Sequence, residues 1–126
     1  MKYFAILSII SVFSSVSVGS ITHTIDQKDK KFSQESIVVN IGDTIVFKNS
    51  DPFQHNVYSL SEGNSFELKI QKPGESSPVP LKKKKFKGGE MMVECAIHPT
   101  MKLKVKINGG DKKESTKKDT KKSAKK

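Results

Sequence analysis

The chain has 126 residues, with 23 lysines and arginines against 13 aspartates and glutamates, a formal net charge of +10, and one cysteine. A chain of this length holds one domain of ordinary size, which excludes enzymes built from separate cofactor and substrate domains, such as dinucleotide-dependent enzymes and kinases. The single cysteine excludes a disulfide framework, a four-cysteine zinc site and an iron–sulfur cluster.

The positive charge at first favours a nucleic-acid partner. All of the cationic residues are lysine, however, and arginine is absent. Arginine supplies the two-pronged hydrogen bonds that read guanine and hold phosphate, whereas lysine gives attraction without specificity. We therefore expect no specific nucleic-acid partner.

The first 20 residues have the composition of a secretory signal peptide. Lys2 precedes an apolar stretch from Tyr3 to Phe13, and small residues follow at positions 17–20. Serines interrupt the apolar stretch, and it is shorter than the roughly 20 residues of a membrane span, so we favour cleavage over anchoring. No cysteine near the cleavage site is available for a lipid. We expect residues 1–20 to be removed and the rest to be periplasmic or otherwise secreted.

Residues 21–109 alternate apolar and polar side chains, as β-strands do, between turns rich in Gly, Pro, Asn and Asp. Five segments carry the pattern: Ile37–Ile41, Ile45–Phe47, Phe66–Ile70, Met91–Cys95 and Leu103–Ile107. No segment offers a capped helical stripe of comparable strength. Short strands at short intervals predict a single all-β domain, either a sandwich or a small barrel.

Two lysine-rich segments accompany this domain. The first contains Lys82, Lys83, Lys84, Lys85 and Lys87. It is interpreted either as a solvated strand edge protected against pairing or as a surface that steers an acidic partner. The second, residues 110–126, has no apolar residue larger than Ala124, so we expect a disordered tail. Its role is either to increase solubility or to make a weak contact with anionic lipid or an acidic partner.

The residues that carry chemistry are His55 and the segment from Cys95 to Met101. Cys95, His98 and Met101 form a C-x2-H-x2-M pattern. Two imidazoles, one thiolate and one thioether are the ligands of a trigonal copper site with a weak axial methionine, whereas a thioether adds little to a zinc site. Haem attachment requires C-x-x-C-H, and a thiolate-bridged binuclear centre requires a second cysteine. His23 has no such companions and is expected to be an ordinary surface residue.

Residues 37–108 resemble the cupredoxins, the small blue copper proteins that include plastocyanin and amicyanin. The matching segments are residues 39–47, 51–57, 72–75 and 95–101, and the short ligand loop is most similar to that of amicyanin. The resemblance implies a cupredoxin-like Greek-key β-sandwich over residues 21–109 and copper ligands at His55, Cys95, His98 and Met101. It also implies that Asn56, outside the ligand set, hydrogen-bonds toward the cysteine loop. Gln54 departs from the family, whose members often carry proline there.

The resemblance further implies one type 1 copper ion that alternates between Cu(I) and Cu(II), in a monomer that carries single electrons. Such a site has no open position for a substrate, so the chain is not expected to be an enzyme. His98 is the expected electron exit, within a patch of Ile97, Pro99 and Phe53. The partner is expected to be a redox protein such as a c-type cytochrome or a reductase, with an acidic docking surface.

An alternative function is copper storage or delivery through the same site. A reversible copper couple with rapid exchange to a cytochrome favours the carrier, whereas copper release to an apo-acceptor favours delivery. A catalytic copper of the nitrite reductase or multicopper oxidase kind requires further histidines, and only His23 is left over.

Overall fold

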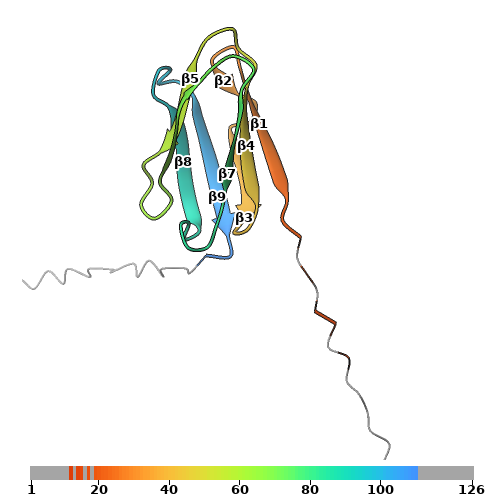
Figure 1. The fold of residues 1–126 in the computed structure, drawn as a ribbon. Helices are drawn as coiled ribbons and strands as arrows, with labels where there is room; N and C mark the ends of the chain where they lie inside the picture. Colours follow the sequence, from red (N-terminus) through yellow and green to blue (C-terminus); the bar gives the residue numbers. More distant parts are fainter. Residues whose placement is uncertain (1–11, 13, 16, 18, 111–126) are drawn as a thin grey trace, which may run out of the picture.

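The structure is a computed structural model that describes residues 12, 14, 15, 17 and 19–110. Most of the predicted signal peptide, and all of the predicted lysine tail except Gly110, therefore fall outside the described residues. Nine strands form two sheets that face each other as a sandwich, and the described part of the chain contains no helix (Figure 1). Accordingly, it offers no helix with the length and apolar character to cross a membrane.

The two sheets are formed from strands that are mixed in sequence order. The first sheet has the order β2-β1-β4-β7, and the second has the order β3-β9-β8-β5-β6. The strands of the first sheet are β1 (Thr22–Lys28), β2 (Lys31–Phe32), β4 (Thr44–Asn49) and β7 (Ser76–Pro80). Those of the second are β3 (Ser36–Asn40), β5 (His55–Ser59), β6 (Phe66–Gln71), β8 (Gly89–Cys95) and β9 (Lys102–Asn108).

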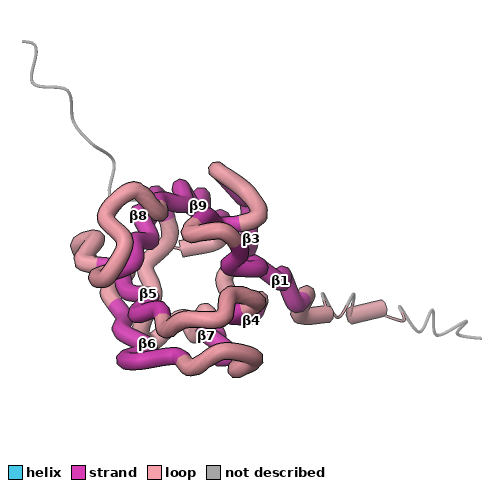
Figure 2. Tube along the Cα trace, turned by 90° about the horizontal axis from the view of Figure 1, so that it is seen from above, coloured by secondary structure: helices cyan, strands magenta, loops and turns pink. Residues whose placement is uncertain are grey.

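The chain crosses repeatedly from one sheet to the other. β1 pairs with β4 in parallel and β3 pairs with β9 in parallel, while the remaining pairs are antiparallel. Viewed along the strands, β9 of the second sheet lies across from β7 of the first (Figure 2), and the core is formed by buried residues of both sheets. This arrangement confirms the predicted all-β Greek-key sandwich.

The core follows the alternation read from the sequence in most strands. Each of the three predicted apolar positions of β9 and of β8 is buried, and Val38 of β3 is exposed between two buried neighbours. The lysines of β9 lie on the opposite, solvated face, where Lys102 and Lys104 pair with Glu94 and Glu90 of β8. The second sheet therefore has one apolar face and one charged face, as expected for an antiparallel sheet beside water.

The prediction for β6 is wrong in its second half. Ile70 is 49% exposed, whereas Gln71 is 1% exposed. The pairing of β5 with β6 shifts register between Asn56 and Tyr58, opposite Lys69, which has a φ of 60°. An extra residue in one strand reverses the alternation beyond it, so Gln71 takes the inward position that the pattern gave to Ile70.

Three further segments differ from expectation, namely the lysine-rich segment and the strands β1 and β7. Lys82–Lys87 is not a strand edge; it is a connection between β7 and β8 that carries a turn, and its Phe86 is buried in the core. The strands β1 and β7 lack a clear alternating pattern, and β7 contains Pro78 and Pro80. Proline is accepted in β7 because this strand is at the edge of its sheet.

His23 is not an isolated surface residue. Its Nε2 lies 2.9 Å from the Asp43 carboxylate, which also accepts hydrogen bonds from the backbone N–H groups of Ile21 and Asn40. Asp43 closes the turn between β3 and β4, where Gly42 adopts a φ of 102° that a residue with a side chain rarely takes. Burial alone would raise the pKa of Asp43, but these hydrogen bonds outweigh it and hold the pKa below 3.8.

Replacing Asp43 with Asn should lower the free energy of unfolding by about 1–2 kcal/mol at neutral pH, since the charged acceptor is lost. Because the pKa is lowered in the folded state, the carboxylate stabilises the fold above about pH 4 and loses that effect as the pH falls further. Urea unfolding from neutral to acidic pH measures the difference, with the exposed Glu62→Gln as control. A difference that persists unchanged in acid would contradict this account.

Candidate metal centre

Three predicted ligands meet at one end of the sandwich. His55 is the first residue of β5 and Cys95 is the last residue of β8, and these neighbouring strands are paired through Val57 and Cys95. His98 lies in the short loop that connects Cys95 to β9. His55 is 0% exposed, Cys95 is 2% exposed, and His98 is partly buried.

The three donor atoms form a compact triangle. The Nδ1 atoms of His55 and His98 are 3.1 Å apart, and the Cys95 Sγ lies 3.6 Å from the first and 3.7 Å from the second. A triangle with these sides has a centre about 2.0 Å from each corner, close to the length of metal–imidazole bonds. These two histidines and one cysteine therefore fit a single first-row metal ion. Among the described residues, no other group of histidine, cysteine, aspartate or glutamate gathers in this way.

Asp51 fixes the orientation and the tautomer of His55. The His55 Nε2 lies 2.8 Å from the Asp51 carboxylate, which is buried. An ionised carboxylate only accepts hydrogen bonds, so Nε2 carries the proton and Nδ1 presents its lone pair to Cys95 and His98. A carboxylate behind a histidine ligand is a common device for orienting the ring and raising its basicity.

Backbone groups hold Asp51 in its ionised form. The turn between β1 and β2 places Asp29 and Lys30 at positive φ, and their N–H groups donate to the two oxygens of Asp51 at 2.6 and 3.1 Å. Burial acts to raise the pKa of Asp51, but the hydrogen bonds from His55 and from this turn hold it below 3.8. The turn between the first two strands thereby contributes to a site whose predicted ligands lie on the second sheet and in the loop between β8 and β9.

Asn49 connects the loop before His55 to the sandwich. Its side-chain amide donates to the carbonyl groups of Phe53 and Gln71, and its side-chain oxygen accepts the N–H of Asp51. Asn49 is 0% exposed. The buried side chain of Asn49 in β4 thus ties the loop that carries Asp51 to β4 and to the end of β6.

The His98 ring remains neutral under ordinary conditions. Burial is the main cause that lowers its pKa below 6.5, and repulsion from His55 and Lys30 adds to this, while Asp51 acts in the opposite direction. The ring of Phe53 packs against both imidazoles, with centroids 5.5 Å from His55 and 5.4 Å from His98. The Lys30 ammonium lies 5.5 Å from the Phe53 centroid. A neutral imidazole is the form that binds a metal ion.

Asn56 contacts the cysteine loop through its backbone. Its N–H points to the Cys95 sulfur at 3.4 Å, and its carbonyl accepts the N–H of Ala96 at 2.9 Å. The side-chain oxygen of Asn56 is buried without a hydrogen-bond partner. The main chain of Asn56 therefore forms the contact with the loop, whatever its side chain.

Met101 is buried at the end of the same loop. Its side chain is 1% exposed, and its N–H donates to the His98 carbonyl at 3.0 Å, which closes a tight turn between the two residues. Its place in the core next to this turn is compatible with the expected fourth ligand.

Sequence reasoning missed Asp51, Asn49 and Lys30, although the carboxylate four residues before His55 was a signal for Asp51.

Two histidines and one cysteine gathered in this way in a small β-sandwich are typical of a mononuclear copper protein. The sequence profile of copper-binding proteins of the plastocyanin/azurin family matches residues 19–108. The chain belongs to this family.

Comparison with individual proteins agrees with this membership. The chain is 27% identical over 100 residues to the methylamine utilization protein MauL of Methylophilus methylotrophus, covering 77% of this chain and 55% of that protein. It therefore spans about half the length of this relative.

Solved structures share the fold. The copper-containing nitrite reductase of Thermus scotoductus superposes with a TM-score of 0.63 at 20% identity, over 79% of this chain and 25% of the enzyme. A variant of amicyanin in the Cu(I) state superposes with a TM-score of 0.60 at 19% identity, over 68% of this chain and 81% of amicyanin. The same sandwich thus occurs alone and as part of an enzyme.

Replacing Asp51 with Asn should lower copper affinity about 10-fold to 100-fold, because His55 loses its charged partner and the turn N–H groups lose acceptors. Competition with a chelator of known affinity measures the change. Asp26→Asn, which removes a nearby acidic side chain outside the site, is the control. Equal affinities in the two variants would contradict the assigned role of Asp51.

Proposed function

We propose that this chain is a secreted, monomeric type 1 copper protein that carries single electrons between redox partners. The observation that carries the proposal is the compact triangle of His55 Nδ1, His98 Nδ1 and Cys95 Sγ. Met101 is the proposed axial ligand, and residues 1–20 are the proposed signal peptide. Copper bound here supplies one-electron chemistry, since three strong ligands and a weak fourth leave no position for a substrate.

The protein contributes a site that needs little rearrangement. His55 is held by Asp51, the cysteine loop by the Asn56 main chain, and the preceding loop by Asn49. Ligands fixed in this way keep similar positions in both oxidation states of the metal, which favours rapid electron transfer over catalysis.

His98 is the proposed electron exit. It is the ligand of the triangle that is only partly buried, and Ile97 beside it is 46% exposed. With Pro99 and Phe53, Ile97 gives this end of the molecule a small apolar surface around the imidazole. A small apolar contact suits a transient partner such as a c-type cytochrome or a reductase, because such encounters need rapid release.

Addition of Cu(II) should produce an intense blue band from thiolate-to-copper charge transfer, and Cys95→Ser should abolish it. Met101→Leu should keep a coloured site with a shifted band and potential, because only the weak ligand is lost. Met92→Leu, which changes a methionine that is 41% exposed, should match the wild type. An undiminished band in Cys95→Ser would disprove the proposed site.

Ile97→Lys should slow electron self-exchange between oxidised and reduced molecules by about tenfold or more, because two apolar surfaces no longer meet. NMR line broadening measures this rate without a natural partner. The absorption spectrum should not change. Leu60→Lys, at an 81% exposed position at the other end of the sandwich, is the control. Equal rates in the two variants would place the exit elsewhere.

A further inference from the structure

The charge of the folded domain is concentrated at the end away from the metal ligands. We define the copper end as residues 28–35, 50–54, 72–75 and 96–101, and the lysine end as residues 41–43, 60–65, 81–88 and 109–110. The copper end has four lysines and four acidic residues, so its charges balance. The lysine end has five lysines against Asp43 and Glu62.

Hydrogen bonds join the segments of the lysine end into one surface. Leu81 exchanges hydrogen bonds with the turn at Gly42 and Asp43, and Lys87 donates to Gly63 and to the Asn64 side chain. Lys82, Lys83, Lys84, Lys85 and Lys87 are all exposed, and none of them forms an ion pair among the described residues.

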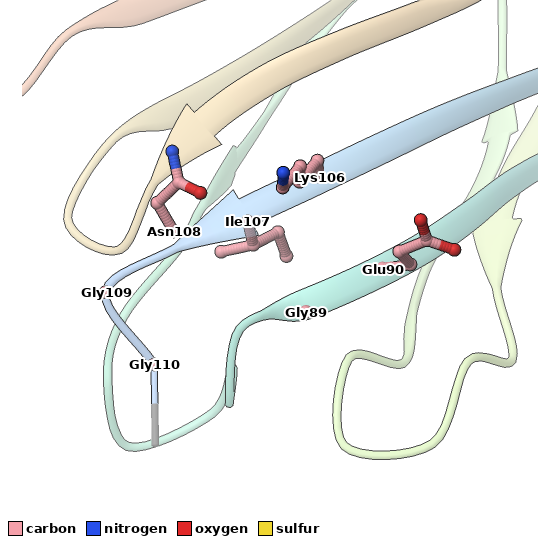
Figure 3. Close-up of a pocket in the computed structure, with 7 residues that line it drawn as sticks. All are labelled: Gly89, Glu90, Lys106, Ile107, Asn108, Gly109 and Gly110. Carbon is pink, nitrogen blue, oxygen red and sulfur yellow. The ribbon is translucent and has the colours of Figure 1, made fainter. Parts of the chain in front are cut away.

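The lysine-rich C-terminal segment starts at this same surface. Gly109 and Gly110 follow β9 and turn toward the loop that precedes Gly89, beside a surface pocket of about 360 Å³ (Figure 3). A Cβ atom at Gly110 would collide with the Lys87 carbonyl, so the chain passes directly against the lysine loop. Residues 111–126, which continue from this point, carry eight lysines and three acidic residues.

We propose that the lysine end forms a contact surface for an anionic lipid bilayer. Lysines near an anionic surface each contribute about 1 kcal/mol of attraction without needing a defined partner geometry. The absence of arginine and the exposure of every lysine in the loop favour a fluid layer of phosphate headgroups over a protein with fixed carboxylates.

This surface also orients the molecule. β8 runs from Gly89 at the lysine end to Cys95 at the copper end, about 20 Å at 3.3 Å per residue. Since salt screens charges beyond about 8 Å, the lysines neither steer a partner to His98 nor draw His98 to the bilayer. The copper end therefore projects into solution while the lysine end is bound. This consequence, unlike the bilayer contact itself, rests on the proposed electron transfer at His98.

Sedimentation with vesicles tests the contact. The copper-loaded full chain, as its expression host processes it, should bind vesicles of phosphatidylcholine and phosphatidylglycerol at low salt, and should not bind phosphatidylcholine alone. The combined variant Lys82→Gln, Lys83→Gln, Lys84→Gln and Lys85→Gln should bind at least about tenfold more weakly. The control variant Lys28→Gln, Lys31→Gln, Lys48→Gln and Lys72→Gln removes the same charge elsewhere and should bind within about twofold of the wild type.

Three results would overturn the contact: equal losses in the two variants, wild-type binding by the loop variant, or retention on polyglutamate without binding to anionic vesicles. The last would assign the surface to an acidic protein. Apo protein should bind vesicles as the copper form does, so failure to bind copper leaves this test intact. A small uncharged ferrocene should reduce bound and free copper protein at equal rates; slower reduction on vesicles would overturn the orientation.

Discussion

The hydrogen bond between the Asp51 carboxylate and His55 Nε2 is the constraint on which the metal centre depends. It decides which imidazole nitrogen carries the proton, and so directs the other toward Cys95 and His98. Asp51 can remain ionised in a buried place because the turn at Asp29 and Lys30 donates two backbone hydrogen bonds to it. The first sheet, which supplies no predicted ligand, thereby orients a predicted ligand of the second sheet.

The same logic explains why a β-sandwich suits this chemistry. Two paired strands deliver His55 and Cys95, and a short loop returns His98 and Met101 to the same end of the molecule. The Asn49 side chain ties the loop before His55 to the sandwich through hydrogen bonds. The main chain of Asn56 ties Cys95 to β5. Side chains held by these hydrogen bonds have little to reorganise when the charge of a bound metal ion changes, which is what the proposed carrier of electrons requires.

The two ends of the molecule differ in charge. Around the proposed copper ligands, positive and negative side chains balance, and the apolar Ile97 next to His98 is exposed. At the opposite end, exposed lysines and the start of the C-terminal segment meet at Gly110. The length of the strands separates these ends by more than the range of screened electrostatic forces. One end is thus suited to brief contact with a redox partner, and the other to attachment at an anionic surface.

The sequence alone determined the fold class and the candidate ligands, because alternation shows which face of a strand is buried and because a lone cysteine near histidine and methionine has few other uses. The predictions from sequence failed where contacts with distant residues overrode the local pattern. The bulge at Lys69 turned Ile70 outward, the edge of a sheet accepted the prolines of β7, and His23 contacts Asp43 in the turn between β3 and β4. The backbone hydrogen bonds to Asp51 and the position of the lysine loop were decided only by tertiary structure, because the groups that form these contacts lie in turns distant in sequence.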